Sequence, residues 1–159
     1  MGAVTVRSEP WLPAHRRAMR GVADELELIG QEIERDAVRY LRDNSVNVDG
    51  DLRKSITSEI RRFMGGALKL ITGPTVQYGE YVHEGTRPHW PPQRPIRRWV
   101  RRKLGVSGAA QVRQVAFLVA RKISREGTEG QPFLEDAFER AQRGLARRIE
   151  SAYLEGFPG

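Results

Sequence analysis

Apolar residues recur at every third or fourth position between residues 13 and 44, and this repeat constrains the fold more than any other feature of the sequence. The repeat consists of Val22, Leu26, Ile29, Ile33, Ala37 and the pair Tyr40–Leu41. On a helix this spacing gathers the apolar side chains into one stripe and leaves the polar residues on the other face. The sequence DNSVNVDGD follows, and its Asn, Asp and Gly residues favour helix ends and turns. The pattern predicts one long N-terminal helix that ends near Asn44.

Three short segments after this helix are predicted to form an antiparallel sheet. LRKSITSEIRRF and ALKLIT flank the sequence Met-Gly-Gly, which is typical of a hairpin turn, and TVQYGEYV follows the turn sequence GPT. Such short connections favour antiparallel neighbours, so we expect a small sheet of about three to four strands. Tyr78 and Tyr81 are three residues apart, which places them on opposite faces of the third strand. They would then offer no shared platform for stacking the bases of a single-stranded nucleic acid.

The second half of the chain is predicted to be helical again. PIRRWVRRKL and AAQVRQVAFLVARKIS are both amphipathic, and a last helix is expected to begin near Pro132. Its apolar stripe runs from Leu134 to Ala152 without interruption. The fold class expected from this order is α+β in a single domain spanning residues 1–159, with the C-terminal helices packed on the sheet. Residues 1–11 are interpreted as a short flexible arm.

The charge balance indicates what kind of partner the chain can have. Its 159 residues include 27 Lys and Arg against 20 Asp and Glu, a formal net charge of +7. A basic excess favours a polyanion or an acidic protein surface as partner. A GC-rich genome, which gives proteins an arginine-rich composition, is the alternative explanation of the excess. The sequence contains no cysteine, which excludes disulfides and thiol catalysis and fits a reducing compartment. No apolar run approaches the length of a membrane helix, so no membrane contact is expected.

A catalytic, metal or cofactor site is not predicted. His83, Glu84 and His89 lie within seven residues, but they lack the H-E-x-x-H spacing that places two histidines on one helical face. Gly85 and Pro88 would also interrupt a helix here. The sequence has neither a phosphate-binding loop nor a nucleophile elbow. A hydrolase that uses His83 and Glu84 remains the enzymatic alternative.

Arginine is concentrated in the segment that follows the proline-rich loop. On a helix, one face would carry Arg97, Arg98, Arg101 and Arg102, and the opposite face would carry Ile96, Trp99, Val100 and Leu104. Arginine binds phosphates and carboxylates through paired hydrogen bonds, so this face is a candidate contact with DNA or with an acidic protein. A merely solvated face is the alternative interpretation.

The loop at residues 85–95 is the second candidate contact. Gly85 is suited to a positive φ, and Pro88, Pro91 and Pro92 restrict the chain around it. A stiff loop loses little entropy on docking, which favours an interface role. The residues assigned to this interface are Gly85, Thr86, Arg87, His89 and Trp90. Trp90 is either an interface anchor or a side chain that folds back into the core.

Three motifs occur in a fixed order: DGDLRKSI, then ITGPTVQYGEYVHEGT, and, after the proline-rich loop, GQPFLEDAFE. Together they resemble the HK97 gp10-like family of tailed-phage neck proteins, also described as tail-completion or head–tail joining proteins. The resemblance covers about residues 20–150. The chain differs from the family at Gly79-Glu80, where Ala-Pro is frequent, and at Glu84, where a bulky apolar residue is common. Residues 91–127 are also longer than in many members and include the arginine-rich helix.

The resemblance implies a non-enzymatic protein of the virion neck, assembled in the bacterial host cytoplasm. Six or twelve copies would form a ring between the DNA-filled head and the tail, next to head-connector or stopper proteins and tail-terminator proteins. The loop at residues 85–95 would dock on a neighbour, and the arginine face would meet double-stranded DNA or an acidic partner. The structural motif would comprise Tyr78, Tyr81, Phe133 and Leu134, the last two pinning the final helix to the sheet. A small basic nucleic-acid-binding protein is the alternative.

Overall fold

The structure is a computed structural model that describes residues 11–44 and 50–157. It confirms the α+β class, with a long N-terminal helix, two small antiparallel sheets and C-terminal helices. Residues 1–10 of the predicted flexible arm lie outside the described residues, and Trp11 already belongs to the first helix. The elements are α1 (Trp11–Asp43), α2 (Asp51–Ser55), β1 (Ile56–Arg62), the 3-10 turn η1 (Met64–Gly66), β2 (Leu68–Pro74), α3 (Tyr78–Glu84), β3 (Gly85–Thr86), α4 (Gln93–Leu104), α5 (Ala109–Glu126), β4 (Thr128–Glu129), α6 (Glu135–Gln142) and α7 (Leu145–Leu154).

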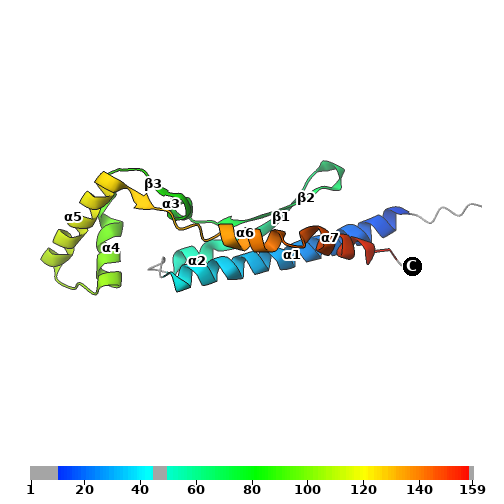
Figure 1. Cartoon of the computed structure of the whole chain (residues 1–159), viewed down its shortest axis with the longest axis horizontal. Coiled ribbons are helices and arrows are strands. Elements are labelled where there is room, and N and C mark those ends of the chain that lie inside the picture. Colours follow the sequence, from blue (N-terminus) through cyan, green and yellow to red (C-terminus); the bar gives the residue numbers. More distant parts are fainter. Residues whose placement is uncertain (1–10, 45–49, 158–159) are drawn as a thin grey trace, which may run out of the picture.

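Helix α1 is the scaffold of the molecule. Its 33 residues make a rod of about 50 Å, and the hairpin β1–β2 and the helices α6 and α7 lie along it (Figure 1). The predicted apolar stripe faces these elements, since Ile29, Ile33, Ala37 and Leu41 are all at most 2% exposed. The prediction of a long helix with one buried face is confirmed.

Strands β1 and β2 form a regular antiparallel hairpin, from the pair Ile56–Pro74 to the pair Arg62–Leu68. The turn η1 closes it at the predicted Met-Gly-Gly sequence. The first predicted strand is shorter than expected, because residues 51–55 form the helix α2. Leu52 of this helix is buried against the end of α1, and the Ser55 hydroxyl donates a hydrogen bond to the Leu52 carbonyl oxygen at 2.8 Å.

The third predicted strand is wrong, because residues 78–84 form the helix α3. Gly79 fits against Pro74, with which a Cβ at this position would collide, and its amide donates to the Val76 carbonyl oxygen at 2.9 Å. The helix turns Val82 toward the buried Phe133. The four strands therefore form two separate two-stranded sheets, β1–β2 and β3–β4.

The last predicted helix is divided into α6 and α7 at Gly144, which has φ 76°. The break lets both helices follow α1, where Leu145 and Ile149 join a cluster around Ile29 and Ile33. Leu70 of β2 contacts the same cluster, and the main contacts of α6 and α7 are with α1.

Arg148 links α7 to α1 through two carboxylates. Its guanidinium donates hydrogen bonds to Glu25 at 2.5 Å and to Glu32 at 2.8 Å. The hydrogen bond from Arg148 holds the pKa of Glu32 below its ordinary value of 4.5. Conversely, the two carboxylates raise the pKa of Arg148, the bond from Glu32 contributing most. The network fastens the C-terminal helix to the scaffold by charge as well as by apolar contact.

Replacing Arg148 with methionine is expected to lower the free energy of unfolding at pH 7 by about 1–2 kcal/mol, because Glu25 and Glu32 lose their partner. A carboxylate whose folded pKa is lowered stabilises the protein above its unfolded pKa and stops doing so as the pH falls through the folded pKa. The difference between wild type and variant should therefore shrink as the pH falls below about 4.5. Urea unfolding at several pH values measures it, with Arg147→Met, at an exposed neighbouring position, as the control.

Helices α4 and α5 form a hairpin at one end of the molecule, opposite the end that carries α7 (Figure 1). This hairpin has its own buried cluster of Val100, Val112 and Ala116. The other two clusters lie along α1 and do not include these residues. We call residues 93–126 the basic arm and the part built on α1 the body.

Candidate docking site

The short strands β3 and β4 join the basic arm to the body. Gly85 pairs with Glu129 and Thr86 with Thr128, and the two threonine hydroxyls are hydrogen-bonded at 2.9 Å. The φ of Gly85 is 80°, positive as predicted from the sequence of the turn. A Cβ there would collide with the Thr128 carbonyl oxygen, and one at Gly127 would collide with that of Thr86. Glycine at both positions lets the two antiparallel segments lie in close contact.

An open groove of about 860 Å³ lies beside this strand pair, between α3, the strands β3–β4 and the loop that follows β3. It brings together most of the predicted interface residues, since Gly85, Thr86, Arg87 and His89 all line it. Trp90 is not among its lining residues. The indole packs instead on Phe117 of α5, with ring centroids 5.7 Å apart, and remains 52% exposed.

Tyr78 and Tyr81 line the same groove, contrary to the expectation that they point in opposite directions. Because α3 is a helix, residues three apart lie on one face, and both side chains are exposed. Glu84 and Glu129 line the groove as well. The tyrosines thus share a surface, but its carboxylates would repel the phosphates of a single-stranded nucleic acid.

The four predicted arginines, Arg97, Arg98, Arg101 and Arg102, are all exposed on α4. Arg98 forms an ion pair with Asp51 of α2 at 3.6 Å. The basic arm contains ten Lys and Arg residues and one Glu, a net charge of +9. Because the whole chain carries +7, the remaining residues have a net charge of −2. The basic excess therefore belongs to the arm alone.

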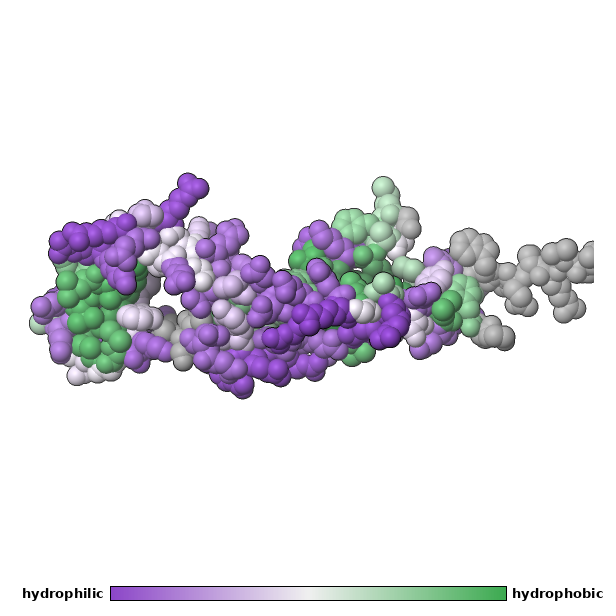
Figure 2. Space-filling view, viewed as in Figure 1, coloured by the Kyte–Doolittle hydropathy of each residue, from purple (hydrophilic) through white to green (hydrophobic). Residues whose placement is uncertain are grey.

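Apolar residues gather over α4 and α5 between the hydrophilic ones (Figure 2). Leu104, Phe117 and Leu118 are each at least half exposed. Two helices alone leave part of their apolar surface open to solvent, and such a surface next to charged residues is typical of protein contacts.

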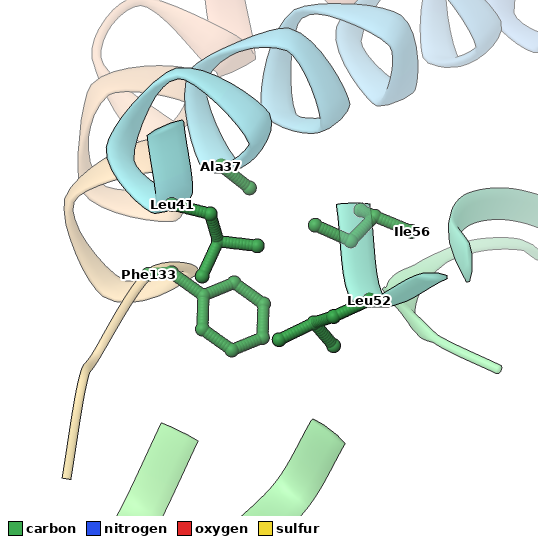
Figure 3. Packing of buried hydrophobic residues seen from close by; sticks show 5 residues of the cluster. All are labelled: Ala37, Leu41, Leu52, Ile56 and Phe133. Carbon is green, nitrogen blue, oxygen red and sulfur yellow. The ribbon is translucent and has the colours of Figure 1, made fainter. Parts of the chain in front are cut away.

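Phe133 is buried and Leu134 is partly buried, and neither lines the groove. Phe133 is 1% exposed and packs among Ala37, Leu41, Leu52 and Ile56 (Figure 3). Leu134 contacts both clusters along α1. They connect the segment before α6 to the body.

The structure does not bring His83 and Glu84 together as an acid–base pair. The His83 ring stands edge-on to Phe133, with centroids 5.1 Å apart, whereas Glu84 lines the groove. The His83 Nδ1 atom is buried without a hydrogen-bond partner. Within residues 11–44 and 50–157, no group of three or more histidines and carboxylates could hold a metal ion. No helix in the same residues is long and apolar enough to cross a membrane.

Comparison with known proteins yields no match: no family model fits the chain, and neither a curated protein nor a solved structure is significantly similar to it.

Proposed function

We propose that this chain is a non-enzymatic structural subunit of a tailed-phage neck, where a ring of copies joins the DNA-filled head to the tail. The observation that carries the proposal is the convergence of the three family-like motifs. Leu52 and Ile56 come from the first motif, Val82 from the second and Phe133 from the third, and all four meet in one cluster. The Gln131 amide also donates a hydrogen bond to the Val82 carbonyl oxygen at 2.8 Å. Motifs far apart in the sequence thus form one structural unit, as they would in a shared fold.

The shape of the chain also suits a subunit of an assembly. The hairpin β1–β2 projects from α1 (Figure 1), and Phe63 and Met64 near its tip are 53% and 100% exposed. The basic arm, at one end of the molecule, exposes Phe117 and Leu118 (Figure 1). Two separate apolar surfaces suit head-to-tail contacts, in which one patch meets a different patch on the next copy.

A stop codon at Trp90 in the genome that encodes the chain tests this function. It removes the basic arm, α6 and α7, so no complete neck subunit can form. Electron microscopy of the lysate should show DNA-filled heads separate from tails, and supplying the intact chain from a plasmid should restore joined particles. Intact, infectious particles from the truncated gene would contradict the proposal.

The net charge of +9 on the basic arm favours a second candidate, a small nucleic-acid-binding protein. Such a protein neutralises phosphates with Lys and Arg and therefore binds DNA less tightly as salt increases. Retention of double-stranded DNA by the isolated chain, lost steeply with added salt, would favour this candidate. The neck function requires no such binding by a free subunit.

A further inference from the structure

We infer that the groove between α3 and the strands β3–β4 receives the arginine face of α4 from a second copy of this chain. This inference rests on the proposed function and deepens it, because it names the contact that would close the ring. The occupant is identified by the chemistry of the groove and by where the chain keeps its basic side chains.

The groove has the groups that recognise arginine. Tyr78 and Tyr81 offer two aromatic rings on one helical face, and Glu84 and Glu129 add two carboxylates. A guanidinium group stacks on an aromatic ring and forms paired hydrogen bonds with a carboxylate. Tyrosines beside glutamates therefore suit arginine better than lysine or an apolar side chain.

The groove and the chain segments that adjoin it have the opposite charge to the basic arm. Two carboxylates, Glu84 and Glu129, line the groove, and Arg87 is the one Lys or Arg among its lining residues. The segments 75–86 and 128–139 include six carboxylates and no Lys or Arg. All six are exposed, and none forms an ion pair within the described part of the chain. These acidic segments contrast with an arm that has a net charge of +9. Two such surfaces on neighbouring copies attract each other.

Arg97 and Arg101 are the side chains best placed to enter the groove of another copy. They lie four residues apart on α4, so they project from one face about 6 Å from each other. Among residues 11–44 and 50–157, neither of them forms an ion pair, and in particular neither reaches Glu84 or Glu129 of its own chain. Each chain therefore has an arginine face and an acidic groove that do not contact each other.

The apolar residues of the arm favour a protein over DNA as its partner. Trp90 and Phe117 of α5 form a half-exposed aromatic pair, and Leu104 is half exposed at the end of α4. A phosphate backbone needs only cations, whereas a protein interface combines arginine with aromatic and aliphatic side chains. The arm combines arginines with aromatic and aliphatic side chains, which is the composition of a protein interface.

A charge-swap experiment on the full chain tests the contact. One variant carries Arg97→Glu and Arg101→Glu, and the other carries Glu84→Lys and Glu129→Lys. Sedimentation velocity of the wild type at low salt should show self-association that weakens as salt increases. Each variant alone should associate at least about tenfold more weakly, because its arm and groove then carry the same sign. An equimolar mixture of the two should associate again, because each arm then meets a groove of the opposite charge.

The control variant carries Arg16→Glu and Arg17→Glu, the same change in charge at exposed positions on the far half of α1, and should associate like the wild type. Circular dichroism confirms that all variants are folded. A wild type that stays monomeric, or a mixture that fails to recover, would overturn the inference while leaving the phage-neck test to stand on its own. Loss of double-stranded DNA retention in the arm variant with unchanged self-association would also overturn it and assign the arm to DNA.

Discussion

Replacing Gly127 with alanine is expected to lower the free energy of unfolding by about 2–4 kcal/mol. Gly127 has φ 76° and ψ −154°, a conformation that essentially only glycine adopts and that costs a residue with a Cβ about 1–3 kcal/mol. The added Cβ would also collide with the Thr86 carbonyl oxygen and lie 3.0 Å from the Arg87 carbonyl carbon. Both contacts are with backbone, which cannot turn aside as a side chain can. Urea unfolding followed by circular dichroism measures the loss.

Gly105→Ala is the control for a left-handed backbone without a collision. Gly105 also has a positive φ, 65°, but a Cβ there would meet nothing within 4 Å. This variant should lose only about 1 kcal/mol, the cost of the backbone conformation alone. Equal losses of unfolding free energy in the two variants would contradict the close contact of Gly127 with the backbone at Thr86 and Arg87.

Replacing Phe133 with alanine is expected to cost about 3–5 kcal/mol of the free energy of unfolding. The ring is 1% exposed and fills the space between the end of α1, the helix α2 and the start of β1. Its removal leaves a cavity lined by Leu41, Leu52 and Ile56, and it also removes the partner of the His83 ring. Urea unfolding again gives the value.

Phe63→Ala is the matched control, since Phe63 is 53% exposed near the tip of the β1–β2 hairpin. The same atoms are removed there with little loss of buried area, so the expected change is below about 1 kcal/mol. A small loss at Phe133 would mean that the three motifs do not depend on one another for stability.

The features that could be predicted from the sequence are those decided by neighbouring residues. The helix α1 follows from a periodicity repeated along its whole length, and the basic face of α4 follows from the spacing of Arg97 and Arg101 alone. The hairpin turn at Met64–Gly66 is also a local signal. For these segments, local preference and the final packing agree.

The groove could not be predicted, because distant parts of the chain form it. The sequence YGEYV reads as a strand by its aromatic and β-branched residues, but Pro74 beside Gly79 and Phe133 beside Val82 favour a helix. Only that helix brings Tyr78 and Tyr81 to one surface. Glu129 reaches the same place through its pairing with Gly85, a contact that no local pattern indicates.

The pairing of β3 with β4 also brings the start and the end of the basic arm side by side. The chain leaves the body after Thr86 and returns at Thr128, and the hydroxyls of these two residues are hydrogen-bonded to each other. The arm is therefore an insertion whose two ends already meet, with an interior of its own. A module of this kind can be lengthened, shortened or exchanged without interrupting the chain of the body.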